Sequence, residues 1–146
     1  MRFAVWVALA TIAGGVPAAA QDAVGAGSGG GALTVELNKF EAGEGGGCRA
    51  YFLFRNATGL AFEDLELSLA VIDADGVIDR LLTIDAAPVP AGRTTLKLFE
   101  IPGIACDGIS EVLLHEVPAC RPQNAEPVDC FDRLDLVSRT DARLVK

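Results

Sequence analysis

Residues 65–84 read LELSLAVIDADGVIDRLLTI, and this stretch indicates the fold class. Apolar residues occupy every second position from Leu65 to Val71, which is the period-two pattern of a half-buried strand. The segment Asp73-Ala74-Asp75-Gly76 follows, and Asp-Gly is a strong signal for a tight hairpin turn. A second apolar run, 78–84, comes directly after the turn. The stretch therefore predicts a β-hairpin, which is the basic unit of an antiparallel all-β fold.

The same rhythm of short strands and turn signals continues on both sides of this hairpin. Seven strands are predicted in all, at residues 33–40, 48–55, 65–71, 78–84, 94–101, 109–117 and 131–138. No long amphipathic helix interrupts them. We therefore expect an antiparallel seven-stranded β-sandwich of the immunoglobulin or fibronectin-III type with two disulfides. A small β-barrel is the alternative.

The first 20 residues have the features of a secretory signal peptide. One positive charge, Arg2, precedes a short apolar run, and three alanines at 18–20 supply the small residues that signal peptidase requires. We expect cleavage after Ala20, although a retained membrane anchor is the alternative. The apolar run is shorter than the roughly 20 residues that span a bilayer. Residues 21–32 form a flexible Gly-rich leader, and residues 33–146 form the β-sandwich domain.

The charge and composition restrict the compartment and the partners. The chain of 146 residues has 20 acidic and 12 basic residues and a net charge of −8. A negative surface repels phosphate, so nucleic acid is an unfavourable partner. Arginine is more frequent than lysine, and alanine and glycine are abundant, as is typical of GC-rich bacterial genomes. We therefore expect a periplasmic protein with no membrane span after signal cleavage.

The four cysteines, Cys48, Cys106, Cys120 and Cys130, indicate structural disulfides in an oxidising compartment. If consecutive strands run up and down, the first-to-second and fifth-to-sixth connections lie at the same end of the domain. Cys48 and Cys106 then meet there, and Cys120 and Cys130 flank one loop at the opposite end. We predict the pairs Cys48–Cys106 and Cys120–Cys130. No Cys-x-x-Cys motif supports a redox or zinc site.

The residue types that carry catalysis are present but are not arranged for it. His115 is the only histidine, no Gly-x-Ser-x-Gly motif exists, and Ser110 and His115 are separated by an odd number of strand positions. Neighbouring carboxylates occur at Glu63/Asp64, Glu111/Glu116 and Asp132/Asp135. These fall at positions that a half-exposed strand turns toward solvent. We expect no catalytic residue.

Two short motifs have ordinary structural interpretations. Asp73-x-Asp75-Gly76 resembles part of a calcium loop, but the position of the required glutamate is Leu82. A hairpin turn is the favoured interpretation. Asn56-Ala57-Thr58 matches a glycosylation acceptor, which in a bacterial chain is most simply a turn. We therefore expect neither a bound metal nor a cofactor.

The segment from Cys48 to Cys130 also carries a resemblance. The stretches CRAYFLFRNATGLAFEDLELSLAVIDADGVI, PAGRTTLKLFEIPGIACDGI and EVLLHEV, with the paired terminal cysteines, resemble an uncharacterised family of exported alphaproteobacterial proteins. Members often carry the label "Tat pathway signal sequence domain protein", although this chain lacks a twin arginine. The resemblance implies export and no particular activity. The same rhythm is similar to fibronectin-III-like domains of bacterial envelope proteins.

Three function classes follow from these observations. The leading hypothesis is a non-enzymatic periplasmic module that binds another envelope protein, or an accessory component of an envelope system, through an exposed edge strand. The expected edges are 33–40 and 134–140, the latter extended by the tail 141–146. The second hypothesis is a carrier of a small molecule between the sheets, or of a metal ion at Glu41, Glu44 and Asp75. A hydrolytic enzyme is the third.

Overall fold

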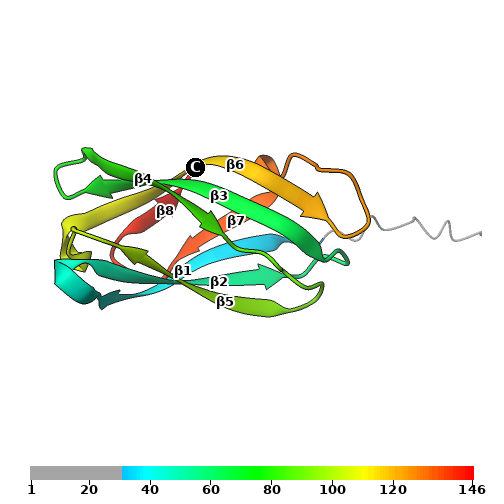
Figure 1. Cartoon of the computed structure of the whole chain (residues 1–146), viewed down its shortest axis with the longest axis horizontal. Helices are drawn as coiled ribbons and strands as arrows, with labels where there is room; N and C mark the ends of the chain where they lie inside the picture. Colours follow the sequence, from blue (N-terminus) through cyan, green and yellow to red (C-terminus); the bar gives the residue numbers. More distant parts are fainter. Residues whose placement is uncertain (1–30) are drawn as a thin grey trace, which may run out of the picture.

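Eight β-strands and three short 3-10 helices make up the computed structural model, which describes residues 31–146 (Figure 1). In chain order the elements are β1 (Leu33–Ala42), η1 (Glu44–Gly46), β2 (Cys48–Asn56), β3 (Phe62–Asp73), β4 (Ile78–Asp85), β5 (Thr94–Ile101), η2 (Cys106–Gly108), β6 (Ile109–Pro122), η3 (Phe131–Arg133), β7 (Leu134–Ser138) and β8 (Arg143–Val145). The predicted signal peptide, 1–20, and residues 21–30 of the predicted leader lie outside the described residues. Within 31–146, no helix is long and apolar enough to cross a bilayer.

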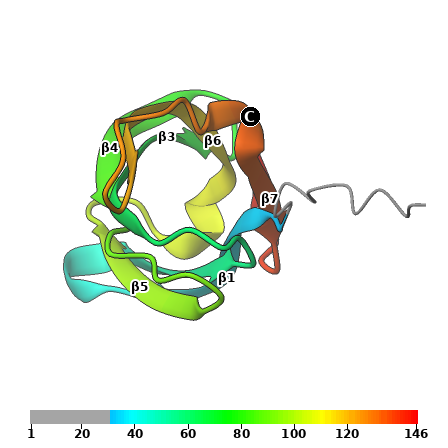
Figure 2. The same cartoon turned by 90° about the vertical axis from the view of Figure 1, so that its right-hand side faces the viewer.

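The strands form two sheets of four. Sheet A has the strand order β5-β2-β1-β7, and sheet B has the order β4-β3-β6-β8. Most neighbours are antiparallel, but β7 runs parallel to β1 and β8 runs parallel to β6. Figure 2 shows the strands arranged around a common interior. The prediction of an all-β fold is therefore confirmed, while the sheets are mixed rather than purely antiparallel.

Alternation along the strands builds one core between the sheets. Inward-facing residues of both sheets are almost completely buried and belong to one apolar cluster. Its largest members are Phe52, Phe54, Leu37, Leu65, Leu67, Leu69, Leu114 and Leu134. The middle of β6 pairs with β3 on one side, and its residues 111–113 pair with β8 on the other. Strand β6 is therefore flanked on both sides within sheet B.

Three expectations about the strands are wrong. The chain has eight strands rather than seven. The first strand is not an edge, because β1 pairs with β2 on one side and with β7 on the other. The tail 141–146 does not extend β7; it turns back and joins sheet B as β8. The Ser138 hydroxyl braces this turn by donating a 2.6 Å hydrogen bond to the carbonyl of Ala142.

Two disulfides connect the strands to the loops at opposite ends of the fold. Cys48 at the start of β2 is bonded to Cys106 in η2, with the two Cα atoms 4.8 Å apart. Cys120 near the end of β6 is bonded to Cys130, with the Cα atoms 6.1 Å apart. These are the pairs expected from strand order. All four cysteines are therefore committed to disulfides.

The quoted hairpin forms as its sequence predicts. Gly76 has a φ of +80°, a conformation that glycine adopts without steric cost. The Asp73 side chain accepts hydrogen bonds from the backbone N–H groups of Asp75 and Val77, both at 2.9 Å. The Asp73 carboxylate thus holds the turn itself, which is the interpretation favoured over a calcium loop.

Candidate functional site

Strand β5 is a long, regular strand with a free edge. It pairs with β2 without a register shift from Arg55↔Thr94 to Cys48↔Ile101, and within the described chain no strand pairs with its other side. The other outer strand of sheet A, β7, has five residues, and β8 in sheet B has three. Figure 2 shows β5 on the same side of the molecule as β4. Strand β4 is also an outer strand, but its pairing with β3 contains a register shift. Strand β5 is therefore the edge best suited to accept another strand.

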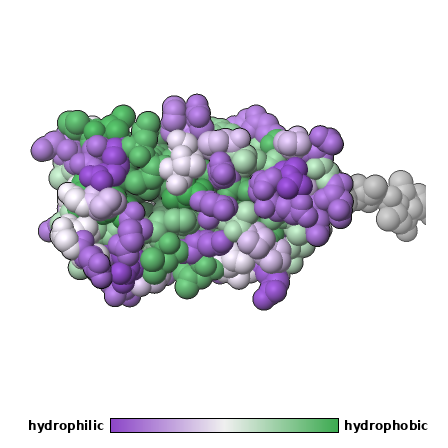
Figure 3. Space-filling view, viewed as in Figure 1, coloured by the Kyte–Doolittle hydropathy of each residue, from purple (hydrophilic) through white to green (hydrophobic). Residues whose placement is uncertain are grey.

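The outward face beside this edge is apolar. Leu96 and Leu98 of β5 are 59% and 45% exposed. They lie directly opposite Leu53 and Tyr51 of β2, which are half-buried. We call these four residues the β5–β2 patch. Figure 3 shows hydrophobic surface gathered near the middle of this side of the molecule, including over the lower strand, where Figure 1 draws β5. Contiguous exposed apolar side chains next to an unpaired strand are a feature of surfaces that bind other proteins.

Charged pairs frame the patch at one end. The Arg49 guanidinium donates a 2.5 Å hydrogen bond to the Glu100 carboxylate, which raises the pKa of Arg49. The Tyr51 hydroxyl donates a 2.7 Å hydrogen bond to Glu41, and the Lys39 ammonium lies 3.1 Å from the same carboxylate. These contacts lower the pKa of Glu41, with the Tyr51 hydroxyl contributing most. The pairs hold the aromatic ring of Tyr51 in place beside Leu98.

A buried carboxylate lies next to the patch on the same face. Glu36 of β1 is only 3% exposed. It accepts a 2.7 Å hydrogen bond from Asn38, and the guanidinium groups of Arg55 and Arg139 lie 3.4 Å and 3.8 Å away. These groups lower the pKa of Glu36, the Asn38 bond most strongly, against the opposing effect of burial. The ion pairs connect β1 to β2 and to the segment after β7. Sequence reasoning did not identify this residue, because it occupies a position that alternation turns toward solvent.

Inward-pointing Lys97 limits what can pair with the β5 edge. Its ammonium group donates a 2.5 Å hydrogen bond to the carbonyl of Ala87, in the segment that follows β4. The bond bridges the gap between the two sheets and fixes the strand's position. A charged side chain pointing inward from an edge strand is a known protection against uncontrolled edge-to-edge pairing. The β5 edge is thus unpaired, but Lys97 disfavours nonspecific pairing with it.

The structure brings His115, Glu116 and Asp132 to the rim of one wide depression of about 510 Å³, but it does not bring Ser110 there. The His115 side chain is exposed, and its ring nitrogen lies 3.6 Å from Glu116. The Ser110 hydroxyl donates to the carbonyls of Ile72 and Asp73, so it serves the backbone rather than His115. A register shift of β6 at this point leaves His115 opposite no residue of β3.

Glu63, Asp64 and Glu111 of the predicted carboxylate pairs have structural partners. Glu63 and Asp64 both accept hydrogen bonds from Arg121, at 2.6 Å and 2.7 Å, and together they raise the pKa of Arg121. Glu111 forms an ion pair with Arg143, which connects β6 to β8. Asp132 lies in η3 and Asp135 in β7, and both are exposed.

The other motif residues also lie apart from one another. Glu41 and Glu44 lie in or near the β1–β2 turn, whereas Asp75 lies in the β3–β4 turn. Among residues 31–146, no three His, Cys, Asp or Glu side chains form a group that fits a metal ion. The Asn56 side chain is buried and donates hydrogen bonds to the carbonyls of Leu60, Val89 and Pro90. It is therefore unavailable for glycosylation.

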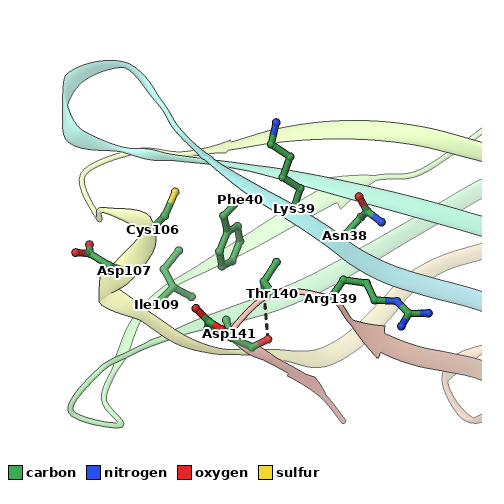
Figure 4. A pocket seen from close by; sticks show the side chains of 10 residues that line it. Asn38, Lys39, Phe40, Cys106, Asp107, Ile109, Arg139, Thr140 and Asp141 are labelled. Carbon is green, nitrogen blue, oxygen red and sulfur yellow. Dashed lines mark hydrogen bonds between the residues drawn. The ribbon is translucent and has the colours of Figure 1, made fainter.

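Two further depressions on the described surface differ in their lining. The first, about 510 Å³ and widely open, lies between β1, η2 and the segment 139–142. Figure 4 shows Phe40 and Ile109 near its centre, while the charged ends of Lys39 and Arg139 point away from Asp107. This geometry brings no acid and base together. The second, about 300 Å³, is mainly apolar and lies between the ends of the two sheets, lined by Leu33, Leu60, Phe62, Pro122, Val128 and Leu134 among others.

Comparison with known proteins gives one structural relationship. No protein-family model matches the chain, and no match is found among curated proteins. The fold is similar to a solved structure described as the structural characterization of IrmA from Escherichia coli. The TM-score is 0.55 at 16% sequence identity, and the alignment covers 72% of this chain and 90% of IrmA. At this identity the similarity concerns the fold alone.

Proposed function

We propose that this protein is a non-enzymatic periplasmic module that binds another envelope protein by adding a partner strand to β5. The observation that carries the proposal is the free, regular β5 edge next to the β5–β2 patch. We further assign the two sheets to an immunoglobulin- or fibronectin-III-like β-sandwich. The single core shared by both sheets supports that assignment.

Strand addition at β5 uses two kinds of interaction. The partner's main chain takes up the unpaired N–H and C=O groups of the edge, which provide affinity without sequence selectivity. Side chains on the partner's outward face then cover Leu96 and Leu98. Completing the burial of two half-exposed leucines contributes about 1 kcal/mol each. The ion pairs around Arg49 and Glu41 form a polar rim, the arrangement usual at protein interfaces.

The proposed compartment rests on the disulfides together with the predicted signal peptide. Disulfides persist in oxidising compartments such as the bacterial periplasm and are rare in the cytosol. The structure has two of them and no described free cysteine. Both features agree with export.

Site-specific photocrosslinking in living cells tests the proposal. A photoreactive amino acid at position 98 should capture a discrete partner, whereas the same residue at position 81 should capture none. Leu81 is the matched control, because it is 61% exposed and lies on the outer strand of the other sheet. The double variant L96K/L98K should abolish the crosslink formed from a third position, Thr94, while L81K leaves it intact. Equal crosslinking from positions 98 and 81, or an intact crosslink in L96K/L98K, contradicts the proposal.

A second candidate function has its own observation. The apolar depression between the sheet ends, about 300 Å³, has a volume at the lower limit of small-molecule sites. It favours a small apolar ligand as the alternative cargo. Native mass spectrometry of protein purified from the periplasm tests this alternative. A bound mass that disappears in the variant Leu134→Trp supports it, and bare protein in every preparation dismisses it.

A further inference from the structure

The two ends of the β5 edge differ in charge. Arg93 directly precedes β5, and Arg55 of β2 lies directly opposite Thr94, the first residue of the strand. With Gly92 and Thr94, these arginines line a depression of about 180 Å³. The Arg55 side chain is 48% exposed and shares Glu36 with Arg139. Arg93 is exposed and makes no salt bridge within residues 31–146. The beginning of β5 therefore presents positive charge with incomplete compensation.

The end of β5 is balanced. Glu100 lies directly opposite Arg49, and the two side chains are already paired at 2.5 Å. Between the two ends lie Leu96 and Leu98, on the same outward face as Thr94 and Glu100. Along this face, the side chains at and beside the edge are basic at the beginning of β5, apolar in its middle and paired with opposite charge at its end. This order stands out in a chain whose net charge is −8.

From this order we propose the chemistry of the partner, an inference that rests on the proposed function. The partner is an extended protein segment with an acidic side chain opposite Thr94 and apolar side chains opposite Leu96 and Leu98. Side chains directly opposite each other on neighbouring strands are in contact, so each position of β5 selects its counterpart. An acidic residue at the first position lies beside Arg93 and within the field of Arg55.

The segment adds antiparallel to β5. Antiparallel ladders are slightly more stable per residue than parallel ones, and β5 already pairs in this way with β2. The acidic residue then comes last in the segment, after the two apolar residues. A basic or polar residue comes first, opposite Glu100. The partner sequence reads, in order, basic, any, apolar, any, apolar, any, acidic.

Synthetic peptides separate this inference from the proposed function. The probe is acetyl-Lys-Thr-Val-Thr-Val-Thr-Glu-amide, and its neutral counterpart ends in Gln instead of Glu. A third peptide exchanges the terminal Lys and Glu, which places the acid correctly only for parallel addition. Binding is measured on the whole secreted protein by isotope-edited NMR titration, with the shifted amides identifying the strand.

The expected result is binding at β5. The peptide that ends in Glu should bind about 3- to 10-fold more tightly than the Gln-ending peptide and the exchanged peptide, as for an exposed but oriented ion pair. The variant R93Q should remove this preference and its salt dependence. R133Q should retain both, since Arg133 is also exposed and makes no salt bridge within residues 31–146. Equal binding of all three peptides at β5, or an unchanged preference in R93Q, overturns the partner chemistry while leaving strand addition intact. Absence of any β5 shift with all three peptides, or full binding by the folded L96K/L98K variant, overturns strand addition itself.

Discussion

The two disulfides should contribute unequally to stability, in a ratio fixed by the loops that they close. Cys48 and Cys106 are 58 residues apart in sequence, whereas Cys120 and Cys130 are 10 apart. In the chain-entropy model, these loops correspond to about 4.2 and about 2.7 kcal/mol at 25 °C. The double variant C48A/C106A should therefore lose about 1.5 kcal/mol more than C120A/C130A from the unfolded-state effect alone.

Burial reduces this difference. Cys48, Cys120 and Cys130 are at most 3% exposed, while Cys106 is only partly buried. Removing the second pair thus deletes two fully buried sulfur atoms, and removing the first deletes one and part of another. Treating a sulfur atom as a group of about methylene size, the half of the Cys106 sulfur that is not buried corresponds to about 0.4 kcal/mol of stabilisation. The net expectation is that C48A/C106A is the less stable variant by about 1 kcal/mol.

Guanidinium unfolding followed by circular dichroism measures this difference. Each variant is compared with the oxidised parent, and the reduced parent serves as a reference that lacks both constraints without any change of side chain. Midpoints convert to free energies through the slope of the transition. A larger loss for C120A/C130A, or equal losses, would refute the loop-entropy account and place the contribution of the disulfides in the native state instead.

Two further predictions concern buried polar side chains. The pKa of Glu36 is lowered below its ordinary value of 4.5, so its carboxylate stabilises the fold above that pH, and the contribution is lost as pH falls through the lower, folded-state pKa. E36Q should lower the free energy of unfolding by about 1.5–3 kcal/mol at neutral pH. It should also weaken the decrease of the urea midpoint with falling pH below about pH 5. The same pH dependence in E36Q and the parent would argue against the role of this carboxylate. Asn56 is 2% exposed and saturates its amide with bonds to Leu60, Val89, Pro90 and Thr58. N56A should therefore cost about 3 kcal/mol or more, and a loss below about 1 kcal/mol in thermal unfolding would show that water replaces the amide.

Local chemistry accounts for what was predictable in the fold. The hairpin at Asp73–Gly76 forms where the Asp-Gly pair indicates, because a glycine with φ of +80° and an aspartate that accepts backbone N–H groups specify the turn by themselves. A strand lies within each of the seven predicted ranges for a similar reason, since alternation is a property of successive residues, although 131–133, predicted as the start of the seventh strand, form η3 instead. β8 was missed because a strand of three residues is too short to show a period.

The candidate site was predictable only in part. Alternation along the predicted strand 94–101 puts Leu96 and Leu98 on one face, and the burial pattern of β5 agrees. It turns that face outward, however, while Thr95, Lys97 and Phe99 point inward and are half-buried. Alternation separates two faces but does not say which of them the core will cover. Glu36 and Arg93 escaped notice because their surroundings come from strands far away in the sequence.

The sequence by itself determined seven of the eight strands, the hairpin, the pairing of the cysteines and the absence of a recognisable catalytic motif. These follow from short-range patterns and from the order of the strands. Only the tertiary structure decided which strands are edges, because an edge is defined by what fails to pair with it. Strand β1 has a parallel neighbour 101 residues further along the chain, in the pairing of Leu33 with Leu134, and is therefore not an edge. The outer position in sheet A belongs to β5 instead, where the outward-facing leucines lie beside the flanking arginines.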